Sequence, residues 1–154
     1  MKNEKSKKSK KKSVETIGKL PPRYSFILNQ YVEERLSKCP KCNQPTHQRK
    51  FPLFIHIENY GPIVQGFTCR YCTRCELIVA HQHELEEQLA RSFLLINPRV
   101  IGNKYLVVGT VDRKVWQQGM KEAATIEATL NHLADFKEVL TLEVKPAGWY
   151  RSEE

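Results

Sequence analysis

Five cysteines in a chain of 154 residues fall into two clusters that could bind a metal ion. The first is the turn Cys39-Pro-Lys-Cys42, and the second is Cys69-Arg-Tyr-Cys72-Thr-Arg-Cys75. Each Cys-x-x-Cys turn offers two thiolates, so two such turns about 30 residues apart complete the tetrahedral ligand set of a structural zinc site. The spacing therefore predicts one structural Zn²⁺ per chain.

The second cluster leaves a choice, because Cys69/Cys72 and Cys72/Cys75 both have two residues between them. We favour the latter pair, since the apolar segment 77–79 begins just after Cys75, as a strand leaving a metal-binding turn would. Cys69 would then belong to the incoming strand. The predicted ligands are Cys39, Cys42, Cys72 and Cys75.

Other chemistry for these residues has less support in the sequence. His81 or His83 could replace a cysteine, but the cysteine quartet is already complete. A lone CPKC suggests thiol–disulfide exchange when it opens a helix after a strand, whereas here a turn and a hairpin are expected to follow. Catalytic zinc needs an open coordination position, which four thiolates close, and no HExxH or GxSxG motif or phosphate loop is present. We therefore name no catalytic residue and no small-molecule substrate.

A predicted β-hairpin connects the two cysteine clusters. Apolar residues alternate between Phe51 and Ile57 in a strand expected over 46–57, residues 58–62 favour a turn, and 63–68 form the returning strand. Pro52 lacks an amide hydrogen, which indicates a sheet edge or a bulge at that position. Two cysteine turns joined by a hairpin make a zinc ribbon.

Helical periodicity follows the second cluster and recurs near the C-terminus. A helix from His81 or Gln82 to about Leu95 would bury the side chains of Leu85, Leu89, Phe93 and Ile96. Before the first cluster, Asn29 could cap a short helix up to Ser37, or residues 24–28 could form an extended edge segment.

The last third has a strand–helix–strand rhythm. We expect a buried strand over 105–111, a short helix capped by Asp112 and ending at Gly119, a helix over about 121–138 and a strand over 139–144. The predicted fold class is α+β, with a four-cysteine zinc ribbon, a following helix and a small β-α-β C-terminal part. The expected divisions are a tail (1–13), the ribbon region with its helix (14–98) and the C-terminal part packed on it (99–154).

The formal net charge of +8 is unevenly distributed. Residues 2–12 hold seven lysines and one glutamate, so +6 lies there and only +2 remains elsewhere. With no apolar residue after Met1, we expect residues 1–13 to form a disordered basic tail that either binds RNA or DNA phosphates or serves solubility alone. The proposed nucleic-acid contacts are Lys7, Lys8, Lys10, Lys11, Lys12, Arg49, Lys50, Arg70 and Arg74, with Tyr71 as a base-stacking partner.

The sequence shows neither a membrane span nor a secretory signal. Its apolar runs are far shorter than the roughly 18–20 residues needed to cross a bilayer, and no apolar segment follows the basic N-terminus. We expect a cytoplasmic location, where thiols stay reduced and paired Cys-x-x-Cys turns hold metal more often than they form disulfides.

Residues 39–90 resemble the zinc-ribbon domain of antitoxins of the MqsA type. The likeness rests on CPKC and on YCTRCELIVAHQHELEEQL, in which a second CxxC is followed by a short apolar stretch and a helix. It implies a closed zinc site that includes Cys72 and Cys75, on a scaffold that often binds another macromolecule. The chain departs from the pattern in having Asn43 and Glu76 where glycine is common, and no helix-turn-helix follows, so antitoxin function is not implied.

Together these features predict a small cytoplasmic zinc-binding protein with a noncatalytic role. It would bind a partner protein or nucleic acid through the ribbon and the basic tail. The alternative is an enzyme of unknown reaction, with its site in the C-terminal part and a purely structural zinc.

Overall fold

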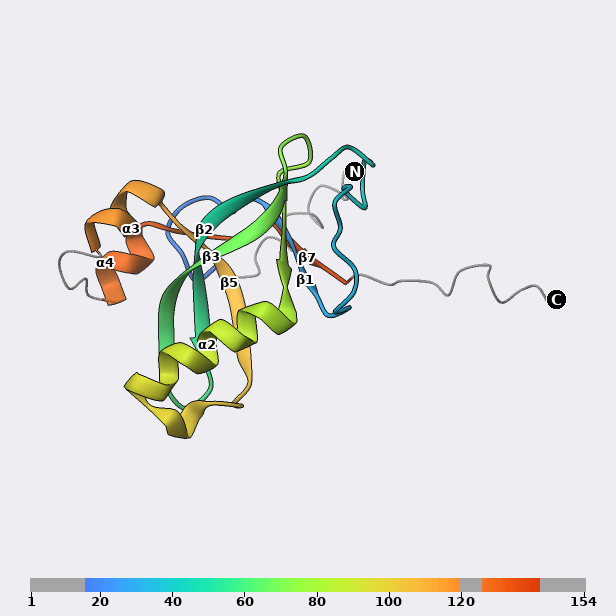
Figure 1. Ribbon diagram of the computed structural model, residues 1–154. Coiled ribbons are helices and arrows are strands. Elements are labelled where there is room, and N and C mark those ends of the chain that lie inside the picture. Colours follow the sequence, from blue (N-terminus) through green and yellow to red (C-terminus); the bar gives the residue numbers. More distant parts are fainter. Residues whose placement is uncertain (1–15, 120–125, 142–154) are drawn as a thin grey trace, which may run out of the picture.

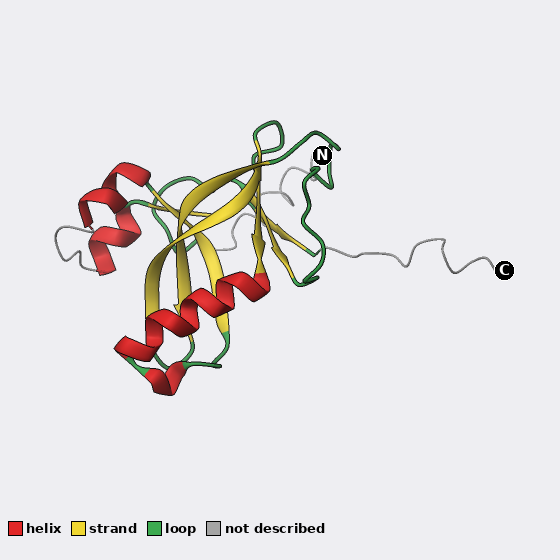
Figure 2. Ribbon diagram, viewed as in Figure 1, coloured by secondary structure: helices red, strands yellow, loops and turns green. Residues whose placement is uncertain are grey.

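The computed structural model describes residues 16–119 and 126–141, which form a mixed α+β fold around one sheet (Figures 1 and 2). The sheet has seven strands in the order β6-β5-β2-β3-β4-β1-β7. In chain order the elements are β1 (Ser25–Asn29), β2 (His47–Ile57), β3 (Gly61–Cys72), β4 (Leu77–His81), α2 (Gln82–Ile96), η1 (Pro98–Val100), β5 (Tyr105–Val111), α3 (Arg113–Gly119), α4 (Ile126–Asn131), β6 (Leu133–Asp135) and β7 (Glu138–Leu140).

The expected hairpin between the cysteine clusters is confirmed. β2 and β3 pair antiparallel from His47 opposite Tyr71 to Ile57 opposite Gly61. The turn between them uses positive φ at Asn59 and Gly61, a backbone that asparagine and glycine tolerate best. The hairpin therefore brings the chain before β2 back beside the end of β3, where the second cluster lies.

Pro52 lies where β2 has a partner on one side only. β5 pairs with β2 from Leu53 to Ile57, with a register shift between Phe54 and Ile55. Within the described part of the chain, residues 47–52 of β2 pair only with β3. A residue without an amide hydrogen is tolerated at such an edge, as expected from the sequence.

The two edge strands of the sheet, β6 and β7, are consecutive in the sequence, with only Phe136 and Lys137 between them. The sheet is therefore curled, so that its two edges lie close together. Backbone hydrogen bonds join this corner to the segment before β1: the Arg23 amide donates to Asp135 O at 2.9 Å, and the Lys137 amide donates to Tyr24 O at 2.7 Å. The ring of Phe136 stacks on that of Phe26, with centroids 4.4 Å apart. These contacts join the start of the described chain to its end and hold the two edges of the curled sheet together.

α2 lies across the curled sheet and covers its main core (Figure 1). Leu85, Leu89 and Phe93 are buried against sheet residues, as the periodicity predicts. Ile96 was expected to join them but is 58% exposed, like its neighbours Leu94 and Leu95 in the last turn of α2.

Two further helix predictions are wrong, the first entirely and the second at its C-terminal end. Residues 30–37 form no helix: Asn29 ends β1, and its side chain instead accepts from the Tyr31 amide and donates to Glu34 O. The extended alternative for residues 24–28 is correct in conformation, since β1 covers Ser25–Asn29, but wrong in placement, because β1 lies between β4 and β7 and not at a sheet edge. The helix expected over 121–138 ends at Asn131, because residues 133–135 pair with β5 as β6. Residues 120–125 and 142–144 lie outside the described residues.

The C-terminal part contributes to the same sheet as the β2–β3 hairpin. β5 is antiparallel to both β2 and β6, so the expected order of strand, helix and strand is present without a parallel β-α-β unit. α3 begins after Asp112, whose carboxylate accepts from the Val115 amide, as predicted. Among the described residues no helix is long and apolar enough to cross a membrane.

Candidate metal centre

Four of the five cysteines converge at one place. The sulfurs of Cys39, Cys42, Cys72 and Cys75 all lie within 4.8 Å of one another. Cys39 Sγ is 3.9 Å from Cys75 Sγ, and Cys42 Sγ is 3.6 Å from Cys72 Sγ. These distances are too long for disulfides, whose sulfurs lie about 2.05 Å apart. The cluster could hold a metal ion, and its members are the four predicted ligands.

The two cysteine turns have matching local geometry. The Lys41 amide points at Cys39 Sγ at 3.3 Å, and the Cys75 amide points at Cys72 Sγ at 3.4 Å. The residue after each second cysteine has a left-handed backbone, with φ of 64° at Asn43 and 52° at Glu76. Both cysteine turns therefore adopt the left-handed backbone that glycine would favour, although neither position is a glycine.

Backbone amides and burial act on the thiols in opposite directions. A hydrogen bond with the Gln44 backbone lowers the pKa of Cys42 to about 7. Burial raises the pKa values of Cys72 and Cys75. A bound cation would stabilise the thiolate forms of Cys72 and Cys75 that burial disfavours, because coordination to a metal deprotonates a thiol outright.

The first turn belongs to a covering segment, residues 30–46, that lies over the outer face of β1 and β4. Beneath it Ile27, Leu77 and Val79 form a small apolar cluster with the cysteines. A Lys38–Pro45 bridge closes the loop around Cys39 and Cys42. Lys41 Nζ reaches Glu138 Oε2 on β7 at 3.2 Å. The second turn is the connection from β3 to β4, so the cluster joins the covering segment to the sheet.

Cys69 lies apart from the cluster. It is buried in the main core on β3, and its thiol contacts Phe67 O at 3.6 Å. Burial raises its pKa far above the usual value of a thiol. It is therefore a neutral core residue, and the hydrophobic segment after Cys75 was the sequence signal that separated it from the ligands.

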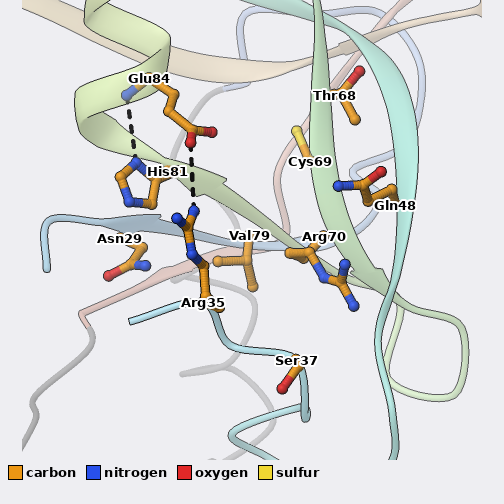
Figure 3. A pocket seen from close by; sticks show the side chains of 10 residues that line it. All are labelled: Asn29, Arg35, Ser37, Gln48, Thr68, Cys69, Arg70, Val79, His81 and Glu84. Atoms are coloured by element: carbon orange, nitrogen blue, oxygen red, sulfur yellow. Dashed lines mark hydrogen bonds and ion pairs between the residues drawn. The ribbon is translucent and has the colours of Figure 1, made fainter. Parts of the chain in front are cut away.

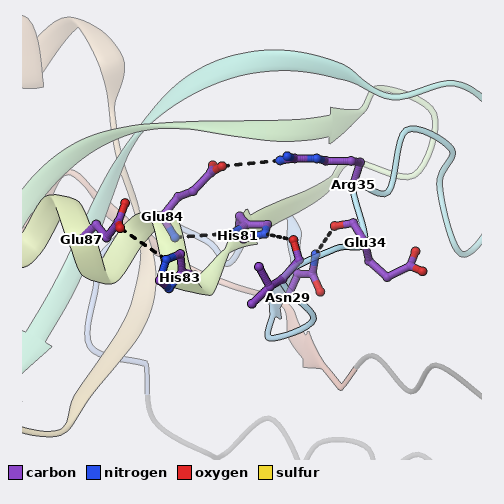
Figure 4. Close-up of polar contacts among 8 residues, drawn as sticks. Asn29, Glu34, Arg35, His81, His83, Glu84 and Glu87 are labelled. Atoms are coloured by element: carbon purple, nitrogen blue, oxygen red, sulfur yellow. Dashed lines mark hydrogen bonds and ion pairs between the residues drawn. The ribbon is translucent and has the colours of Figure 1, made fainter.

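His81 and His83 do not join the cluster either. Figure 4 shows His81 between the covering segment and α2, where Nδ1 accepts from the Glu84 amide and Nε2 lies 3.0 Å from Val32 O. His83 pairs with Glu87 at 3.3 Å. Arg35 of the covering segment reaches Glu84 at 3.5 Å in the same view. These contacts hold the front of the covering segment on the start of α2.

A polar cavity of about 250 Å³ lies between the covering segment and the sheet (Figure 3). Its charged side chains already have partners. Arg70 donates to Thr46 Oγ1 and Thr46 O at 3.0 and 2.6 Å, and Arg35 pairs with Glu84. The cavity is therefore part of the joint that fixes the covering segment.

The basic residues that the sequence singled out have different surroundings. Arg70 is held by Thr46, as above. Arg74 is exposed in the second cysteine turn. The guanidinium of Arg49 lies over the rings of Phe51 and Tyr71, and Lys50 Nζ lies 5.8 Å from the Trp116 ring.

Tyr71 is not available for base stacking, contrary to the expectation. It is 3% exposed and makes edge contacts with Tyr24, Phe51 and His47. The lysines of the tail, Lys7, Lys8, Lys10, Lys11 and Lys12, lie outside the described residues.

Comparison with known proteins adds no relative: no family model matches the chain, and no curated protein or solved structure shows significant similarity to it, so the likeness to MqsA-type antitoxins stays a prediction.

Proposed function

We propose that the chain is a zinc-binding protein in which Cys39, Cys42, Cys72 and Cys75 hold one structural Zn²⁺. The observation that carries this proposal is the convergence of four sulfurs. Zn–S bonds of about 2.3 Å place the sulfurs of a tetrahedral site about 3.8 Å apart. The cross-turn distances of 3.9 and 3.6 Å lie on either side of that value. Four soft thiolates also favour zinc over magnesium or calcium.

The zinc would stabilise the fold rather than react. Four protein thiolates leave no open coordination position for water or substrate. The ion would fix the covering segment on the β3–β4 connection, above the small apolar cluster of Ile27, Leu77 and Val79. We further propose a noncatalytic role in binding a partner protein or nucleic acid, which the exposed basic side chains and the lysine-rich tail support.

Elemental analysis of the full-length protein, purified without chelator, tests the metal site. We expect one zinc per chain, and loss of zinc on chelation should lower the unfolding temperature. Well under one zinc per chain would contradict the proposal. Identifying the molecules that copurify with the native protein tests the binding role.

A further inference from the structure

The sheet opens where β2 and β5 diverge, and a second cavity lies in that opening. Pairing between these strands ends at Leu53 and Thr110. Beyond it a cleft of about 380 Å³ is bounded by residues 20–24, by residues 49–52 of β2 and by residues 110–113. We call it the arginine cleft, because its charged lining residues are Arg23, Arg49, Arg113 and Asp112.

The charge of the arginine cleft is positive and incompletely neutralised. Three arginines line it against one aspartate, an excess of two positive charges. Asp112 is already occupied as the cap of α3. Arg23 reaches Glu76 outside the cleft at 3.5 Å, but both side chains are largely exposed, so this pair neutralises it weakly. The cleft thus carries charge that the fold itself does not use.

Arg49 is the central cation of this lining. Its guanidinium carbon lies 4.9 Å from the centroid of Phe51 and 5.2 Å from that of Tyr71. These cation–π contacts with two buried rings hold the guanidinium group in place without using its N–H groups. Within the described residues Arg49 has no hydrogen bond or ion pair, so its five donors remain available to a ligand.

Arg113 also lines the arginine cleft. One of its Nη2 donors bonds to Lys50 O at 2.6 Å, which holds α3 beside the unpaired edge of β2. A bond to a neutral carbonyl leaves the positive charge of Arg113 uncompensated. Two guanidinium groups, each positioned by its neighbours, therefore face the same opening, and planar guanidinium groups are the preferred partners of phosphate oxygens.

The cleft continues into an exposed edge, which favours an extended ligand over a compact one. Four consecutive residues of β2, His47 to Lys50, are exposed along the strand. Arginine, lysine and proline on this edge disfavour pairing with another strand. The aromatic rings beneath are buried, with Tyr24 and Phe51 at 6% and 2% exposure, so they offer no face to a base. Recognition would thus rest on phosphates and not on sequence.

We propose that the arginine cleft binds the phosphate backbone of a single-stranded nucleic acid. The proposal deepens the binding role suggested above and rests on it, but it is independent of the metal. Arg49 and Arg113 supply the phosphate contacts inside the cleft, and Lys50 adds charge along the exposed edge. Arg70, one of the contacts expected from the sequence, is instead occupied by Thr46.

Titration of labelled single-stranded RNA and DNA of about 12 nucleotides, within the usual range of site sizes, tests this. The full-length protein is compared with Arg49→Gln and Arg113→Gln. A third variant replaces the five tail lysines Lys7, Lys8, Lys10, Lys11 and Lys12 by glutamine. Arg99→Gln, an exposed arginine in η1, is the matched control for the loss of one positive charge. Zinc content and melting temperature are measured for every variant.

We expect Arg49→Gln and Arg113→Gln each to weaken binding at least about fivefold for every oligonucleotide sequence, and to reduce the slope of log affinity against log salt by about 0.7. Arg99→Gln should bind like the parent protein. The cleft variants should show the same loss when combined with the tail variant. Arg49→Lys should restore part of the affinity, because it keeps the charge but loses the planar fork.

Three results would overturn the proposal. Unchanged affinity in Arg49→Gln, with all binding lost in the tail variant, would assign the interaction to the tail. Equal affinity for inorganic phosphate or a mononucleotide would make the cleft a small-anion site. Equal affinity for an acidic polypeptide would indicate a protein partner. In each case a zinc content of one per chain would still support the proposed metal site.

Discussion

Asn43 and Glu76 occupy equivalent positions after the last cysteine of their turns, and both have a left-handed backbone, with φ of 64° and 52°. Asparagine adopts this conformation readily, whereas for glutamate it costs roughly 1–2 kcal/mol. The ion pair between Glu76 and Arg23 is exposed and contributes little in return. The two turns thus share a geometry that only one of them reaches without strain.

Glu76→Gly should therefore leave stability unchanged or raise it by up to about 1 kcal/mol, since glycine adopts positive φ without a steric penalty but loses more chain entropy on folding. Zinc content should be unaffected. Urea denaturation of the zinc-loaded protein measures the change. Glu58→Gly, in the hairpin turn but without a positive φ, is the control and should lose stability. A loss in Glu76→Gly larger than in the control would show that the Glu76 side chain matters more than its backbone.

The cysteine positions and the hairpin were predictable because both are local patterns. The alternation from Phe51 to Ile57 and the turn at Asn59 fix the register that brings the two cysteine clusters together. Cys69 could be excluded only indirectly, from the apolar segment after Cys75. In the structure its place on β3 puts its side chain in the core.

Cys69→Ser should keep the metal, and Cys72→Ser should lose it. Cys69 lies outside the sulfur cluster, while Cys72 contacts Cys42 across the two turns. Since burial raises the pKa of Cys69, its thiol should also stay unreactive toward alkylating reagents in the native zinc-loaded protein and react on unfolding. Zinc content and mass spectrometry after alkylation provide both measurements. Loss of zinc in Cys69→Ser together with its retention in Cys75→Ser would reverse the choice of ligands.

Glu138 connects β7 to both β1 and the first cysteine turn, and it should make stability depend on pH. The hydroxyl of Ser25 donates to its carboxylate at 2.9 Å, and Lys41 lies at 3.2 Å; these contacts lower the pKa of Glu138. A lowered pKa in the folded state means that the contribution is present above the unfolded value of about 4.3 and is lost as the pH falls through the folded value.

Glu138→Gln should therefore destabilise the protein by a few tenths of a kcal/mol at neutral pH, since the carboxylate is partly exposed, and by nothing in strong acid. Urea denaturation of both proteins at about pH 7 and about pH 3, each stripped of zinc beforehand so that metal loss in acid does not enter the comparison, tests this. Glu33→Gln, an exposed glutamate of the covering segment, is the control and should show no pH-dependent difference. A constant difference at both pH values would contradict the assignment.

The closure of the sheet could not be predicted from local patterns. Residues 133–135 continue a helical periodicity, yet they form β6 because β5 and the Leu20 bridge offer backbone partners that a helix would forgo. Likewise the 30–37 segment has helix-compatible residues, but the pairing of β1 between β4 and β7 ends in a turn capped by Asn29. In both segments, pairing with distant strands determines the secondary structure, in place of the local helical pattern.

Gly109 is where this closure leaves no space for a side chain, and Gly109→Ala should disrupt it. A Cβ at this position would lie 2.1 Å from Ala134 O and 2.7 Å from Asp135 Cα, both backbone atoms of β6 that cannot rotate away. Since β6 pairs with β5 through Gly109, Thr110 and Val111, we expect a loss of roughly 1–3 kcal/mol or more. Thr110→Ser, which removes one methyl group from the next buried residue of the same strand, should cost less. Thermal denaturation ranks the two variants, and hydrogen exchange should show faster exchange of the β5 and β6 amides in Gly109→Ala while the β2–β3 hairpin stays protected. Parent-like stability in Gly109→Ala would mean that β6 can move away from β5 without loss, and that the sheet is closed by the segment before β1 alone.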